Sequence, residues 1–183
     1  MAEELLAENP TFHTSENAYD WLGHGMYFWE NNLTRAQLYA QSLVRRRKIQ
    51  QPYVIGAVLK LGYCFDLIDS FSLQTLKHDY EALKVLTELS GDPLPENSPA
   101  SSTDRDNLYR HLDCAVIEYM HATRVKADLR PYDSVRGAFW EGGELYPTAG
   151  FKEKNHIQLC IRNANCIKGY FRPLALNDRF NNV

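Results

Sequence analysis

The sequence predicts one α+β domain over residues 1–183, built as a split, twisted sheet of about six strands. Segments with strand alternation occur in both the first and the last third of the chain. Between them, over about residues 72–123, leucines recur at helical spacing and predict an inserted pair of helices. Neither strand-rich part has enough strands for a sheet of its own, so we expect both to complete a single domain.

The N-terminal part predicts a helix, a strand and a second helix. Residues 2–8 have the pattern of a helix end that stops before a proline. Residues 25–29 predict a short aromatic strand, after which Asn31 or Asn32 can cap the next helix. That helix is expected to extend to about Lys48. Its apolar face comprises Leu33, Ala36, Ala40, Leu43 and Val44.

The middle of the chain predicts a buried strand followed by the inserted helices. Residues 53–61 are rich in β-branched and aromatic residues and are followed by a glycine. The first inserted helix is expected to end with Gly91 as its cap. A Pro/Ser-rich loop over 92–103 follows and is expected to be mobile. Thr103 and Asp106 approximate a capping box that would open the second helix.

The C-terminal part predicts three strands, at residues 132–141, 155–161 and 165–171. A long polar loop, residues 142–154, joins the first two of them. Its single projecting aromatic residue is Phe151. Loops of this kind carry function more often than simple connections do, so we expect this loop to be functional.

Composition argues against two classes of partner. The net charge is −3 and the pI is about 6.1, so no global field favours nucleic acid or a membrane. The local basic run at 45–48 is expected to complement a helix C-terminus, with a phosphate contact as the alternative. No apolar run is long enough to span a membrane, and the acidic first ten residues do not have the pattern of a signal peptide.

The four cysteines predict free thiols in a reducing, cytoplasmic compartment. They are Cys64, Cys114, Cys160 and Cys166. None belongs to a Cys-x-x-Cys motif, and none pairs with a histidine at the spacing of zinc ligands. We therefore expect no metal.

Residues 19–40 are the strongest candidate for a binding site. Gly23 and Gly25 bracket His24, and glycine allows a ligand to approach the backbone closely. Nearby aromatic side chains could supply a flat surface for a planar ring. They are Tyr19, Trp21, Tyr27, Phe28, Trp29 and Tyr39. The alternative is a buried strand preceded by a glycine turn.

Strand 155–161 offers a second group of polar residues. Alternation places its three aliphatic residues on one face and His156, Gln158 and Cys160 on the other. A glutamine beside a histidine needs hydrogen-bond partners if it is buried, so this second face predicts a polar cleft, a ligand or solvent. The alternative is an edge strand with one wet face.

These two regions are expected to form one pocket around Tyr27, Tyr39, His156 and Gln158. On the aromatic strand, Tyr27 lies on one face and Phe28 on the other. Tyr39 lies at the margin of the next helix's apolar face, where it could close over a ring held on Tyr27. Ordinary core packing is the alternative for Tyr39.

Three segments together resemble ADP-ribosyltransferases of the diphtheria-toxin and poly(ADP-ribose) polymerase branch. Residues 23–28 (GHGMYF) and the helix after them are similar to the family's Gly-x-Gly-[Ile/Leu]-Tyr-Phe strand–helix unit. Residues 54–62 resemble the family's next strand, which also ends in Leu-Gly. The 142–154 loop and its strand resemble the unit that recognises the acceptor and carries the catalytic glutamate. The segments occur in the family's order.

The resemblance implies a split β-sandwich that binds NAD, without a metal, and transfers ADP-ribose with release of nicotinamide. In the family the tyrosine of the first motif stacks on nicotinamide, a role that maps onto Tyr27. Beside the cofactor the resemblance implies Gly23, His24, Gly25 and Phe28. A second aromatic residue covers the other face, and it maps, one residue out of register, onto Tyr39. The family's glutamate polarises the ribose and stabilises an oxocarbenium-like transition state.

Two departures from the family pattern bear on activity. No acid opens strand 155–161, so His156, Gln158 or Glu144 must substitute, and a glutamine cannot supply negative charge to a developing cation. The family's first strand carries His-x-Thr or His-x-Ser, and residues 2–8 already match the helix that follows it. That strand is expected upstream of Met1. We therefore expect the 183 residues of this sequence to bind NAD weakly and to transfer ADP-ribose slowly or not at all.

Three functions therefore remain open. The first is a mono-ADP-ribosyltransferase of bacterial or phage toxin type, with Phe151 helping to choose a protein or nucleic-acid acceptor. The second is a catalytically inactive member of the fold that binds NAD, ADP-ribose or a partner. The third is an unrelated α+β binding module. A neutralising partner or a second copy could cover an exposed sheet edge, and no membrane partner is expected.

Overall fold

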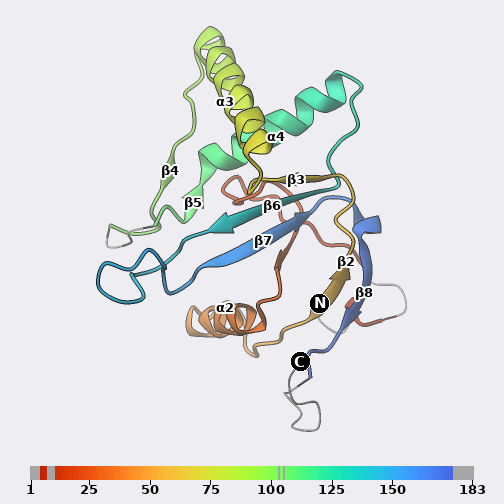
Figure 1. Cartoon of the computed structure of the whole chain (residues 1–183), viewed down its shortest axis with the longest axis vertical. Helices are drawn as coiled ribbons and strands as arrows, with labels where there is room; N and C mark the ends of the chain where they lie inside the picture. The colour runs from red at the N-terminus through yellow and green to blue at the C-terminus, as the bar shows by residue number, and fades with distance from the viewer. Residues whose placement is uncertain (1–4, 8–10, 103, 105, 175–183) are drawn as a thin grey trace. The chain divides into compact units, whose positions relative to one another are not determined.

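The structure, a computed structural model, describes residues 5–7, 11–102, 104 and 106–174 (Figure 1). The chain forms two compact units, and each is described by itself. Unit 1 comprises Met1–Thr11, Asn31–Lys60 and Ile167–Val183, and unit 2 comprises Phe12–Glu30 and Leu61–Cys166. Both units bring together segments that are far apart in the sequence.

A four-stranded mixed sheet forms the centre of unit 2 (Figure 1). In spatial order its strands are β1 (Met26–Trp29), β7 (His156–Ile161), β6 (Ser134–Phe139) and β3 (Cys64–Asp66). β3 and β6 run parallel, and the other neighbours are antiparallel. β7 is thus an interior strand, so the alternative of a wet edge strand for residues 155–161 is wrong.

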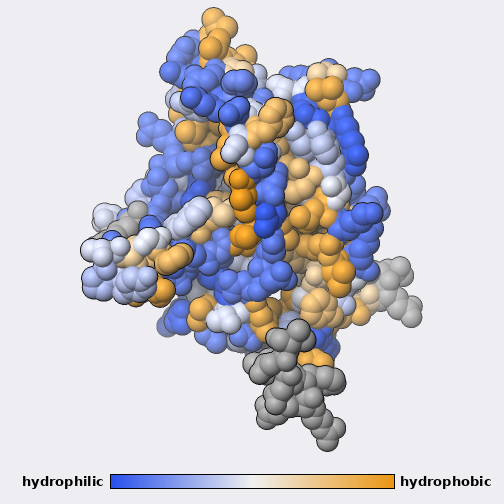
Figure 2. All heavy atoms as spheres, viewed as in Figure 1, coloured by the Kyte–Doolittle hydropathy of each residue, from blue (hydrophilic) through white to orange (hydrophobic). Residues whose placement is uncertain are grey.

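Two helices complete unit 2: α3 (Ser70–Ser90) and α4 (His111–Lys126). The Asp69 side chain caps α3 by accepting a hydrogen bond from the Ser72 amide at 2.9 Å. Gly91 closes this helix in the left-handed conformation, as predicted. α4 buries five of its residues, whereas α3 buries none and exposes hydrophobic side chains among hydrophilic neighbours (Figure 2).

The core of unit 2 lies between α4 and one face of the sheet. Its buried residues are Leu22, Phe65, Ile117, Met120, Tyr132, Val135, Phe139 and Cys160. Tyr27 is the register partner of Cys160, which is in turn opposite Val135, so these three side chains share that face. Trp21 and Tyr27 are half-buried and pack against the same cluster.

α4 begins at His111, later than predicted, so the proposed capping box at Thr103 and Asp106 is wrong; Thr103 itself lies outside the described residues. The helix is capped instead by the distant Asn97, whose Oδ1 accepts hydrogen bonds from two first-turn amides at 2.9 and 3.2 Å. Asn97 is held in a short antiparallel strand pair, of which one strand lies in the predicted loop and the other in the region predicted as the second helix. These strands are β4 (Asn97–Ser98) and β5 (Tyr109–Arg110).

The described part of unit 1 includes a long helix and an antiparallel strand pair. They are α2 (Leu33–Arg45), β2 (Gly56–Leu59) and β8 (Ile167–Phe171). Asn32 caps α2, because its side chain accepts a hydrogen bond from the Arg35 amide at 3.0 Å. The helix ends before the predicted Lys48, since Arg47 takes the left-handed conformation with φ 56°.

The predicted α+β class is confirmed, and the predicted strands occur with somewhat shorter bounds. Strand β3 was not predicted, because it has only three residues and no clear alternation. A 3₁₀ turn at Ala164–Cys166 precedes β8. The helix predicted over residues 2–8 falls largely outside the described residues, and the single-domain assignment stays a prediction.

Candidate functional site

The glycines before β1 are required by packing inside unit 2. Gly23 has φ 74°, and a Cβ there would lie 2.5 Å from Oε1 of Glu118 on α4. A Cβ on Gly25 would lie 2.5 Å from the Sγ of Cys160 on β7. Both contacts are too close for any side chain. The glycine spacing is thus explained by the close fit of this loop against α4 and β7, without a ligand.

The Tyr27 side chain is hydrogen-bonded to the backbone of the same loop. Its hydroxyl donates to the Gly23 carbonyl at 2.6 Å and accepts from the Leu22 amide at 2.8 Å. Burial, with a smaller contribution from the neighbouring Cys160, raises the pKa of this phenol above its ordinary value. Tyr27 therefore stays protonated and holds the loop in place. Phe28 points to the opposite face of the sheet, so it cannot line a site next to the Tyr27 ring.

A carboxylate that no sequence motif marks, that of Glu118, lies against the His24 backbone. Glu118 Oε1 accepts a hydrogen bond from the His24 amide at 2.7 Å, and its two oxygens form a forked pair with the Arg162 guanidinium at 2.5 and 3.1 Å. Arg162 also donates to the His24 carbonyl at 2.8 Å. The His24 peptide is thus clamped from both sides by a residue of α4 and a residue just after β7.

The pair is ionised in this setting. Burial by itself would raise the pKa of Glu118, but the hydrogen bonds from Arg162 and the His24 amide outweigh it and lower the pKa. Nothing in the local sequence marks Glu118, because it lies 94 residues from His24 and only the packing of α4 brings the two together. Its oxygens serve the loop, so we assign Glu118 a positioning role.

His156 and Gln158, predicted as site residues, form a hydrogen-bonded pair at the start of β7. The His156 Nδ1 lies 2.6 Å from the Lys154 carbonyl, which can only accept, so Nδ1 carries the proton. The Nε2 therefore accepts from the Gln158 amide nitrogen at 2.9 Å. With the Gln158 amide in this orientation, the Nε2 of His156 carries no proton and the Gln158 carbonyl oxygen is left as an acceptor.

Two aromatic rings pack against His156, and the Arg110 guanidinium packs against both of them. Its ring centroid lies 6.1 Å from that of Trp21 and 5.7 Å from that of Phe139. The Arg110 guanidinium stands 4.1 Å from the Trp21 ring and 4.8 Å from the Phe139 ring. Within the described part of the chain, the buried Nε of Arg110 has no hydrogen-bond partner. No local sequence pattern marks Arg110, because its aromatic neighbours are distant in sequence.

The face of β7 that carries His156, Gln158 and Cys160 is largely covered. His156 is 7% exposed and Cys160 is completely buried, whereas Gln158 is half-buried. This face was predicted to look onto a polar cleft, a ligand or solvent. Its part at Cys160 does not, because Cys160 is completely buried in the core. The reason is α4, which packs over it. Tyr27 and Gln158 do lie on one face, since Trp29, two residues after Tyr27, is the register partner of Gln158.

The 142–154 loop is compact and bears more than one projecting apolar side chain. Glu144 accepts a hydrogen bond from the Thr148 amide at 3.0 Å and so organises the loop's own turn. Phe151 is 61% exposed, as predicted for a projecting residue, but Tyr146 at 56% is nearly as exposed. The prediction of a single projecting aromatic is therefore wrong, because the turn at Tyr146 also directs its side chain to solvent.

Tyr39 belongs to α2 in unit 1 and is 41% exposed. Tyr27, His156 and Gln158 belong to unit 2. The closure of Tyr39 over a ring on Tyr27 therefore stays a prediction.

No family model, curated protein or solved structure matches this chain.

All four cysteines are free thiols. Among the described residues, no group of three or more His, Cys, Asp or Glu side chains is arranged to hold a metal ion. In the same part of the chain, no helix is both long and apolar enough to cross a membrane.

Proposed function

We propose that this chain is a mono-ADP-ribosyltransferase that transfers ADP-ribose from NAD to a protein or nucleic-acid acceptor and releases nicotinamide. One observation carries the proposal. The two motifs of the family resemblance, Gly23–Phe28 and the strand from His156, lie on neighbouring strands, with Tyr27 and Gln158 on the same face. Segments more than 100 residues apart thus lie on adjacent strands, which supports one shared site. With this function we propose the family's split β-sandwich as the fold. We also propose a reducing cytoplasm as the compartment.

Gln158 is the residue to which we assign contact with the ribose. Its amide nitrogen is committed to His156, so its carbonyl oxygen is the acceptor that remains for a ribose hydroxyl. His156 then acts as a positioning residue, since the Lys154 carbonyl fixes its tautomer. Cleavage of the glycosidic bond develops positive charge on the ribose, and a carbonyl dipole stabilises that charge less than a carboxylate would. Slow transfer is therefore expected.

The hydrogen-bonded pair of His156 and Gln158 favours a second candidate function. A neutral histidine and an amide stand where the family has its glutamate, so the chain could bind NAD or ADP-ribose without turning it over. The Glu118 carboxylate, which reaches the loop before β1 from α4, is already committed to Arg162 and the His24 amide.

Incubation with NAD, followed by chromatography for free nicotinamide and calorimetric titration of NAD, separates these functions. Transfer predicts nicotinamide release that falls about tenfold or more in Gln158→Ala, because the ribose loses its acceptor. His156→Gln should lower turnover without abolishing NAD binding. Glu144→Gln should change neither, because Glu144 serves its own turn.

Gln74→Ala is the matched control, because it removes the same side chain from an exposed position of α3. Binding of NAD without nicotinamide release would support the inactive member of the fold. An absence of both binding and release would overturn both candidates and leave the unrelated binding module.

A further inference from the structure

The two units divide the charge of the chain very unequally. Unit 1 holds nine Lys and Arg residues and four Asp and Glu residues, whereas unit 2 holds eleven and nineteen. The four acids of unit 1 (Glu3, Glu4, Glu8 and Asp178) lie outside the described residues. The described part of unit 1 therefore carries eight basic side chains and no acidic one. A net charge of −3 for the whole chain conceals this basic unit.

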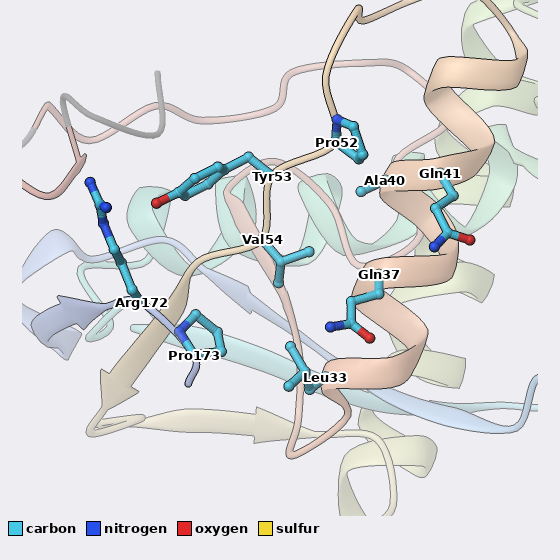
Figure 3. Close-up of a pocket in the computed structure, with 9 residues that line it drawn as sticks. All are labelled: Leu33, Gln37, Ala40, Gln41, Pro52, Tyr53, Val54, Arg172 and Pro173. Carbon is cyan, nitrogen blue, oxygen red and sulfur yellow. The ribbon is translucent and has the colours of Figure 1, made fainter. Parts of the chain in front are cut away.

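Unit 1 also has a hollow of about 470 Å³, a size that suits a ligand as large as a nucleotide (Figure 3). It lies between α2, the segment before β2, and the chain just after β8. Gln37 and Gln41 border it from α2, Tyr53 from the second segment and Arg172 from the third. The Tyr53 side chain is 48% exposed, and the Arg172 guanidinium stands 5.9 Å from its ring.

The stripe of α2 that borders the hollow leads toward the basic run at residues 45–48. Gln37, Gln41 and Arg45 are spaced four residues apart, so they lie on the same side of the helix. Arg45 lies about 6 Å beyond Gln41 along the helix axis. It opens the exposed run of residues 45–48, and none of these four has an ion-pair partner among the described residues of unit 1.

We propose that this surface of unit 1, formed by Gln37, Gln41, Tyr53, Arg172 and residues 45–48, binds single-stranded nucleic acid. Cations attract the phosphates, the exposed Tyr53 ring offers a face on which a base can stack, and the two side-chain amides can bond to base edges. A duplex keeps its base faces stacked away from a tyrosine, so single strands fit this arrangement better. That the nucleic acid is the acceptor of ADP-ribose rests on the transferase proposal.

Fluorescence anisotropy with a labelled single-stranded RNA of about 12 nucleotides, without NAD, tests the surface. Single-stranded DNA of the same sequence and the matching duplex complete the comparison. We expect both single strands to bind about tenfold or more tightly than the duplex, with affinity that falls steeply between about 50 and 200 mM salt. Equal binding of duplex and single strand would overturn the proposal.

Two variants of exposed residues assign the contacts. Arg46→Glu combined with Lys48→Glu should weaken binding about tenfold or more and reduce the slope of log affinity against log salt by about 1.4, the value for two phosphate contacts. Tyr53→Ala should weaken binding about fivefold or more without changing that slope. Lys77→Glu combined with Lys84→Glu, on exposed positions of α3 in unit 2, changes the net charge equally and should leave binding within about twofold.

Binding of other polyanions would contradict the proposal. If phosphatidylserine vesicles or polyglutamate bind as tightly as RNA and lose affinity in the same variants, the surface recognises a membrane or an acidic protein and the proposal fails.

The mass of the oligonucleotide after incubation with NAD separates the nucleic-acid proposal from the transferase proposal. Nicotinamide release without added mass on a bound strand overturns the acceptor assignment alone. Strand binding without any nicotinamide release overturns the transferase and leaves the nucleic-acid surface standing.

Discussion

Removal of the Glu118 carboxylate should destabilise unit 2 by about 2 kcal/mol, a value between those for exposed and for fully buried ion pairs. Glu118→Ala deletes the acceptor of the His24 amide and both hydrogen bonds from Arg162. An exposed pair contributes about 0–1 kcal/mol, and breaking a buried one costs about 3–5 kcal/mol. The Glu118 and Arg162 side chains are 26% and 22% exposed, so an intermediate value applies.

Urea unfolding measures this loss. A change of about 2 kcal/mol lowers the midpoint by about 1 M for a typical dependence on denaturant. Glu118→Gln keeps an acceptor for the His24 amide and should lose about half as much. Glu81→Ala, at an exposed position of α3, is the matched control and should stay within about 0.5 kcal/mol of the unmodified chain.

The pH dependence gives a second, independent readout. The pKa of Glu118 is lower in the folded chain than its ordinary value of 4.5, so its stabilisation is complete above that value. It is lost as the pH falls through the depressed pKa, and the unmodified chain and Glu118→Gln should then converge. Two results would refute the clamp of His24 by Glu118 and Arg162. One is a loss of less than about 0.5 kcal/mol in the free energy of unfolding of Glu118→Ala at pH 7. The other is a stability difference between the unmodified chain and Glu118→Gln that does not change with acidification.

Three further predictions concern the same unit. Gly23→Ala should cost about 2 kcal/mol or more in urea unfolding, because its φ is 74° and the added Cβ meets Glu118 at 2.5 Å. Tyr27→Phe keeps the ring but leaves the Leu22 amide without its acceptor, and should cost about 1–3 kcal/mol in the same assay. Burial lowers the pKa of His121 to about 4. Stability should therefore fall as the pH drops from about 6.5 to about 4, where only the unfolded chain binds this proton, and His121→Leu should remove that part of the pH dependence.

Local interactions made much of the fold predictable. Asn32 and Gly91 act at the helix ends where they were predicted, because a cap depends on a few neighbouring residues. The strand at 156–161 was predicted from alternation within six residues. The same local reasoning failed at α4, whose cap is Asn97, 15 residues before the amide that it binds.

The sequence by itself determined the α+β class, most strands and the pairing of a Gly-x-Gly loop with an aromatic strand, since each depends on backbone preference and short-range periodicity. Only the tertiary structure brought Glu118 to the His24 peptide and explained Gly23 and Gly25 by packing. It also gathered residues 31–60 and 167–174 into one basic unit, which the net charge of the whole chain conceals. Such contacts depend on which distant segments bury their apolar faces against each other, and no local pattern records that choice.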